Sequence, residues 1–171
     1  SLIDRAVRER WIDVYPNKNK DSGAFSWGCY GATPVVLCNF EGNLSSVFTL
    51  AHELGHAMHT YLSNTHQPIQ TAGYVIFVAE VASITNEMLL LDYLLKNCET
   101  NEEKKYYLDY FLTEVRSTIF RQTMFSEFEE WSHKTFEKGE ALTRESLCKK
   151  YKELNESRRP SGLRKTKFVF N

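Results

Sequence analysis

The stretch AHELGHAMH, residues 51–59, is the part of this 171-residue sequence that decides the fold. His52 and His56 are four positions apart, so on an α-helix their side chains project from one face, a single turn apart. Two imidazoles placed in this way can bind one metal ion, and Glu53 can act as a general base toward a water held there. This is the H-E-x-x-H pattern of zinc sites. The alternative is a histidine-containing amphipathic helix without a metal.

A helix over about residues 44–63 is expected to carry this motif. Gly42 and Asn43 supply a turn and an N-terminal cap just before it. Glycine at position 55 lowers helix propensity by about 1 kcal/mol relative to alanine. Gly55 therefore indicates that another part of the chain approaches the helix closely at this point. The apolar background of the helix consists of Phe48, Leu50, Ala51, Leu54, Ala57, Met58 and Tyr61.

Composition restricts the classes of function. Hydrophobic residues make up 42% and charged residues 25% of the chain, which is typical of a soluble globular domain. A net charge of -1 gives no reason to expect binding to nucleic acid or to an anionic membrane. The N-terminus does not resemble a signal peptide, and no stretch is apolar enough to span a bilayer. The cysteines are widely spaced without a C-x-x-C pair, which favours free thiols in the cytoplasm; they are Cys29, Cys38, Cys98 and Cys148.

The segment before the motif helix predicts a β-hairpin over about residues 22–40. Residues 24–30 (AFSWGCY) and 35–40 (VVLCNF) have the composition of strands, and GATP at 31–34 is typical of a turn. Residues 10–21 are polar and are expected to form a loop. An extended peptide could add to the edge of this sheet beside the metal, but a purely structural hairpin fits the pattern equally well.

A second helix, over about residues 75–96, is expected to supply the third metal ligand. A catalytic zinc needs three protein ligands and one open position. Glu80 stands among apolar residues, where a carboxylate is costly unless it is paired or bound to a metal. Glu87 lies two turns further on and could accept a hydrogen bond from a ligand histidine. The alternatives are a buried salt-bridge partner for Glu80 and a helix-surface charge for Glu87.

His59 is a rival third ligand, since it follows His56 by three residues on the same side of the helix. Three ligands from two turns of one helix would crowd the ion, whereas a carboxylate from a second helix surrounds it more nearly tetrahedrally. We therefore expect Glu80 to be the ligand. His66 and His133 have no partner pattern and are expected to be surface or packing residues.

The rest of the chain predicts further helices. Thr100 and Glu103 form a capping box at the start of a long helix that runs toward residue 136. Thr143 is expected to cap a last helix to about residue 155. The basic segment 157–171 is expected to be a tail, separate from the domain over residues 1–156.

Four runs of sequence now carry a resemblance to a known family. They are HELGHAMHTYLSNTHQP (52–68), GYVIFVAEVASITNEMLL (73–90), SGAFSWGCYGATPVVLCNFEGNLSSVFTLA (22–51) and STIFRQTMFSEFE (117–129). These runs resemble the oligoendopeptidase F group of the thimet-oligopeptidase-like zinc metallopeptidases. The resemblance implies a mainly α, zincin-like helical catalytic domain with a small N-terminal antiparallel sheet or hairpin. It also implies one zinc ion and cleavage of internal bonds in short peptides inside the cell.

The resemblance assigns roles to matched positions. It makes His52, His56 and Glu80 the zinc ligands and Glu53 the catalytic base, while His59 is not carried over as a ligand. Members of the group continue past the last helix with a histidine and tyrosines that stabilise the oxyanion, and these residues are not matched here. The resemblance therefore implies a partial catalytic domain over residues 1–156, followed by an atypical basic tail over residues 157–171. We therefore expect either a zinc metalloendopeptidase or a catalytically silent zinc-binding fragment that self-associates through exposed apolar surface. A metallocarboxypeptidase with the same chemistry is a third possibility.

Overall fold

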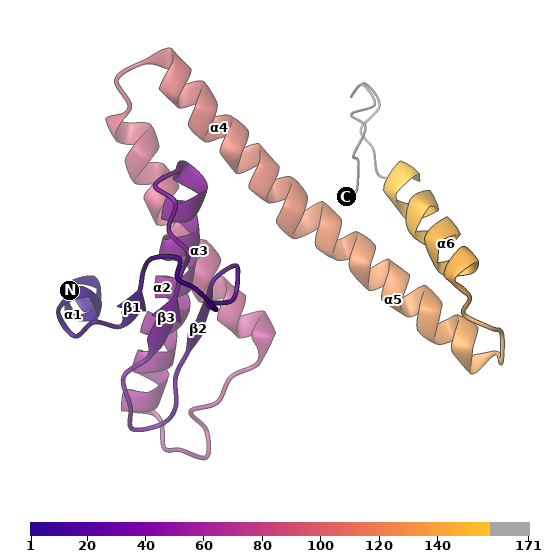
Figure 1. The fold of residues 1–171 in the computed structure, drawn as a ribbon, viewed down its shortest axis with the longest axis horizontal. Helices are drawn as coiled ribbons and strands as arrows, with labels where there is room; N and C mark the ends of the chain where they lie inside the picture. The colour runs from indigo at the N-terminus through magenta and orange to yellow at the C-terminus, as the bar shows by residue number, and fades with distance from the viewer. Residues whose placement is uncertain (158–171) are drawn as a thin grey trace. The chain divides into compact units, whose positions relative to one another are not determined.

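The computed structural model describes residues 1–157 and contains two compact units, one over Ser1–Lys104 and one that begins at Lys105. Figure 1 shows helix α1, three short strands, and helices α2 and α3 in the first unit. The boundary between the two units falls within helix α4. The predicted tail, apart from Ser157, lies outside the described residues, and the predicted single domain over 1–156 stays a prediction.

Helices α2 (Leu44–His66) and α3 (Ile76–Asn97) lie against each other and form the centre of the first unit. Asn43 caps α2 as expected, because its side-chain oxygen accepts a hydrogen bond from the Ser46 amide at 2.8 Å. The helix continues to His66, three residues past the predicted end. A Cβ at Gly55 would lie 2.7 Å from the Ser83 Cα, so only glycine lets α3 come this close. The expected close approach at Gly55 is thus confirmed.

A small mixed sheet lies beside α2, with strand order β1-β3-β2. Strands β2 (Phe25–Trp27) and β3 (Val35–Leu37) are antiparallel, which confirms the predicted hairpin. Strand β1 (Ile12–Asp13) pairs in parallel with β3 and lies within the segment expected to be a loop. That expectation was wrong because two residues are too few to show an alternating pattern. The sheet, α1 (Leu2–Arg8) and α2 share a core of Ala6, Trp11, Val36, Cys38, Leu54 and Ala57.

The predicted C-terminal helices begin at the end of the first unit and continue through the second. Helix α4 (Asn101–Val115) leads through a π-helical turn, η1 (Arg116–Phe120), into α5 (Arg121–Glu137). The capping box is present, since the Thr100 hydroxyl accepts from the Glu103 amide and the Glu103 carboxylate accepts from the Thr100 amide. Helix α6 (Arg144–Ser157) contacts α5 through Phe128 and Tyr151. None of the helices within residues 1–157 combines the length and apolar character needed to cross a membrane.

Candidate metal centre

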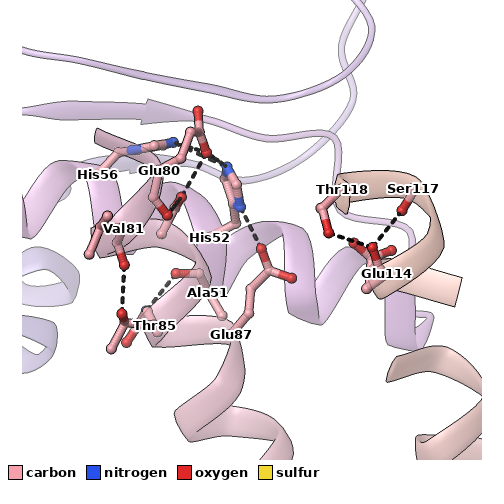
Figure 2. A network of polar contacts seen from close by, with 12 residues as sticks. Ala51, His52, His56, Glu80, Val81, Thr85, Glu87, Glu114, Ser117 and Thr118 are labelled. Atoms are coloured by element: carbon pink, nitrogen blue, oxygen red, sulfur yellow. Dashed lines mark hydrogen bonds and ion pairs between the residues drawn. The ribbon is translucent and has the colours of Figure 1, made fainter. Parts of the chain in front are cut away.

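Two helices bring three potential metal ligands together. His52 and His56 project from α2, and Glu80 reaches them from α3, as Figure 2 shows. The two histidine Nε2 atoms are 3.1 Å apart. The Glu80 Oε2 atom lies 3.4 Å from Nε2 of His52 and 3.6 Å from Nε2 of His56. The structure therefore places side by side the three residues that the sequence singled out.

The spacing of these donor atoms fits zinc. Zinc bonds to histidine nitrogen and carboxylate oxygen are roughly 2.0 to 2.2 Å long, and tetrahedral angles then place the ligand atoms roughly 3.3 Å apart. The three observed separations, 3.1, 3.4 and 3.6 Å, lie on both sides of that value. Two imidazole nitrogens and one carboxylate oxygen also form a donor set that zinc accepts, with one coordination position left for water or substrate.

His59 lies outside this cluster. Its ring stacks on Tyr74, with the ring centroids 4.0 Å apart and an angle of 21° between the planes. The grouping of possible ligands within residues 1–157 contains His52, His56 and Glu80 but not His59. The stacked ring has a packing partner in the loop before α3, which gives His59 a role separate from the donor set.

Glu87 is buried and contacts the other side of the His52 ring. Its side chain is only 10% exposed, so the alternative of a helix-surface charge was wrong. The Glu87 Oε1 atom lies 2.5 Å from Nδ1 of His52. If Nδ1 carries the ring proton and donates a hydrogen bond to this carboxylate, the lone pair of Nε2 is free to bind a metal. Burial lowers the pKa of His52, but the hydrogen bond and the negative charge of Glu87 raise it more, so the net pKa is raised.

Two further groups have pKa values shifted by the same environment in the metal-free protein. Burial lowers the pKa of His56, and a positive charge on His52 lowers it further. Burial raises the pKa of Glu53, and the negative charges of Glu80 and Glu87 add to this effect against the opposing His52. A carboxylate with a raised pKa holds a proton more readily, which suits a group that accepts and returns protons near neutral pH.

The surroundings of Glu80 differ from those that the sequence suggested. The side chain is 40% exposed, and its apolar neighbour Phe77 is 82% exposed. Helix α3 buries only one narrow face, at intervals of four residues: Ala79, Ser83, Glu87 and Leu91. Glu80 follows Ala79 directly but is only partly buried, at the rim of that face. The expectation that Glu80 stands in an apolar setting was therefore wrong, although the residue does lie at the histidines.

Sequence reasoning missed two polar residues of α3. The Ser83 hydroxyl donates a hydrogen bond to the Glu80 carboxylate at 2.9 Å. The Asn86 side-chain amide donates to the Ala51 carbonyl of α2 at 2.5 Å, directly before His52. Both residues lie at the helix contact, where serine and asparagine need polar partners. The only available sequence signal was the three-residue spacing from Glu80 to Ser83.

Comparison with known proteins agrees with this geometry. Residues 2–168 match the sequence model of peptidase family M3, so the match extends into the segment set apart as a tail. The chain is 46% identical over 163 residues to oligopeptidase PepF of Bacillus subtilis (strain 168), covering 95% of this chain and 24% of that protein. It is 45% identical over 156 residues to the chromosomal oligoendopeptidase F of Lactococcus lactis subsp. cremoris, covering 90% of this chain and 26% of that protein. The chain thus spans about a quarter of the length of these relatives.

Solved structures share the fold. A crystal structure from Chlamydophila abortus matches with a TM-score of 0.71 and 46% identity, covering 91% of this chain and 26% of that one. One from Bacillus anthracis str. Ames matches with a TM-score of 0.72 at 18% identity, which supports the fold alone. These matches confirm the predicted mainly α fold with a small sheet. With the family match over nearly the whole sequence, the chain belongs to peptidase family M3, in its oligoendopeptidase F group.

Proposed function

We propose that this chain carries the zinc centre of a metalloendopeptidase that hydrolyses internal bonds of short peptides. The observation that carries the proposal is the convergence of His52, His56 and Glu80 at separations of 3.1 to 3.6 Å, which suit a single zinc ion. The names of the relatives, an oligopeptidase and an oligoendopeptidase, support short peptides as substrates. Free thiols at all four cysteines support a reducing compartment such as the cytoplasm.

Each residue has a distinct role in this proposal. When bound, zinc lowers the pKa of a coordinated water and polarises the carbonyl of the scissile bond. His52, His56 and Glu80 hold the ion, and Glu87 orients the His52 ring through Nδ1. Glu53 accepts a proton from the attacking water and returns it to the leaving amine.

A second candidate is a zinc-binding portion without peptidase activity of its own. The chain spans about a quarter of the relatives' length, 24% of one and 26% of another. The first half of α3 and the residue before it also expose a run of large apolar side chains, which supports association with another polypeptide or with a second copy. This run consists of Val75, Ile76, Phe77, Val78, Val81 and Ile84.

Peptide cleavage by the wild-type chain distinguishes these candidates, and Glu53→Gln tests the role of Glu53. The wild-type chain should bind one zinc per molecule and cleave a quenched fluorescent peptide, and a chelator should stop cleavage. The variant should keep its zinc and lose cleavage, because the amide cannot accept the proton. Zinc content is measured by atomic emission, and the full-length Bacillus subtilis relative serves as the positive control.

Three results would contradict parts of the proposal. A wild-type chain that binds zinc but leaves the peptide intact, while the control cleaves it, indicates the silent zinc-binding candidate. Loss of zinc from Glu53→Gln would make Glu53 a ligand rather than a base. Products shortened only from the C-terminus, identified by mass spectrometry, would indicate a metallocarboxypeptidase.

A further inference from the structure

We infer that Ser83 is a positioning residue for Glu80, and that its hydroxyl orients the carboxylate toward the two histidines. This inference rests on the proposed function, since it takes Glu80 to be the third zinc ligand. The Ser83 Oγ atom lies 2.9 Å from the Glu80 Oε2 atom. The same oxygen faces Nε2 of His52 and of His56. The hydroxyl thus selects which carboxylate oxygen is presented to the metal.

Glu80 needs such a contact because packing holds it loosely. Its side chain is 40% exposed at the rim of the helix contact. The neighbouring Phe77 and Val81 side chains are also exposed and do not enclose it. A glutamate with several rotatable bonds loses conformational freedom when it binds a metal. A hydrogen bond that fixes the side chain beforehand reduces this loss, which raises the affinity for the ion.

Ser83 is well placed to supply this hydrogen bond, because the residue is itself held rigidly. It is fully buried where α2 and α3 come closest. A Cβ at Gly55 would lie 2.7 Å from the Ser83 Cα and 2.8 Å from the Ala82 carbonyl oxygen, so the two backbones are in direct contact. A buried donor that keeps the ligand carboxylate in one orientation has the same function as the partners that orient ligand histidines.

A purely structural role is the competing explanation. The Ser83 hydroxyl also lies 3.2 Å from the Glu80 backbone carbonyl, and serine often bonds to a carbonyl of the preceding turn. The hydroxyl has one hydrogen, and the carboxylate is the nearer and the charged acceptor. The two explanations differ in one measurable respect. Only a positioning role makes the effect of Ser83 on zinc binding depend on Glu80.

The test is a double-mutant cycle on the full 171-residue chain. Zinc dissociation constants are measured by competition with a chromophoric chelator for the wild type, Ser83→Ala, Glu80→Ala and the double variant. Removing a group that orients a ligand typically weakens metal binding by about 10- to 100-fold. We expect Ser83→Ala to weaken zinc binding within this range in the wild-type background and to have no further effect when Glu80 is already alanine.

Thr85→Val is the matched control. The Thr85 hydroxyl lies on the same helix and donates a hydrogen bond to the Val81 carbonyl, at 2.6 Å. Its removal should leave the zinc dissociation constant unchanged. The visible absorption spectrum of the cobalt-loaded chain, which reports ligand geometry, should change in Ser83→Ala and not in Thr85→Val. Thermal denaturation of the metal-free variants checks that both are folded.

The possible outcomes separate this inference from the proposed function. Equal losses of affinity from Ser83→Ala in both backgrounds, or no loss in either, would overturn the positioning role and leave the zinc site standing. An unchanged zinc affinity in Glu80→Ala would instead remove Glu80 from the site, and the proposed ligand set and the positioning role would both fall.

Discussion

Replacing Gly55 by alanine tests how closely α2 and α3 must approach each other to form the metal centre. The added Cβ would lie 2.7 Å from the Ser83 Cα, whereas ordinary contact begins at 3.4 Å. The helices must therefore separate locally by about 3.4 − 2.7 = 0.7 Å, because the atom that is met belongs to the backbone and has no rotamer to relieve the clash. This displacement would carry Glu80 away from the two histidines.

The expected magnitude combines two opposing contributions to the free energy of unfolding. Alanine in place of glycine raises helix propensity by about 1 kcal/mol. Overpacking at a tight contact lowers stability by about 1 to 3 kcal/mol. We expect a net loss of roughly 0 to 2 kcal/mol in the metal-free protein. The Glu80 oxygen, now 3.4 and 3.6 Å from the histidine nitrogens, would move beyond the spacing that suits zinc, so affinity should fall by about 10- to 100-fold.

The assay uses urea denaturation of the metal-free chain and zinc competition with a chelator. Gly73→Ala is the control, because a Cβ at Gly73 would meet no atom within 4 Å. This control should leave zinc affinity unchanged. The reasoning would be refuted if Gly55→Ala kept wild-type zinc affinity and gained about 1 kcal/mol of stability, since alanine would then show only its helix propensity.

Two further substitutions probe the acidic groups at the site. Glu87→Gln should weaken zinc binding by about 10- to 100-fold, because the amide orients His52 without a negative charge. The control Asp92→Asn, at an exposed ion pair with Lys96, should leave zinc affinity unchanged. Equal affinity in Glu87→Gln and wild type would contradict the role of Glu87. Glu53→Gln should stabilise the metal-free chain at neutral pH, since burial raises the pKa of Glu53 above 4.5. The folded wild type then binds more protons than the unfolded chain, so the contribution of Glu53 to stability is complete below pH 4.5 and is lost as pH rises through the raised pKa. Urea denaturation between pH 4 and 8 should show that the free energy of unfolding decreases less with pH in the variant than in the wild type. Parallel pH curves for the two proteins would refute the raised pKa of Glu53.

Local pattern was enough to predict the helices that carry the site. His52 and His56 lie on one face because the helical repeat places residues four apart in register, whatever the rest of the chain does. Asn43 was recognisable as a cap because capping is a contact within one turn of the helix. Gly55 pointed to a close approach because glycine is unfavourable in a helix without such a reason.

Contacts between elements could not be predicted in the same way. The sequence pointed to Glu80 because its neighbours are apolar, but the structure leaves its side chain 40% exposed. Sequence could not show this, because the face of α3 that meets α2 depends on how the two helices pack. The same packing determines that Glu87 is buried rather than exposed on the surface. Strand β1 forms only because β3 offers a parallel partner.

The sequence by itself therefore determined the paired imidazoles, the neighbouring Glu53 and the helix that holds all three, since these depend on residues within two turns of one another. The tertiary structure alone decided that Glu80 reaches the histidines, that Ser83 is buried beside Glu80 and that Glu87 contacts His52. The physical reason is that the contacts of Glu80 and Glu87 with the histidines arise between two helices, and the burial of Ser83 follows from the same packing. Their geometry follows from the close packing at Gly55, which no pattern within one helix specifies.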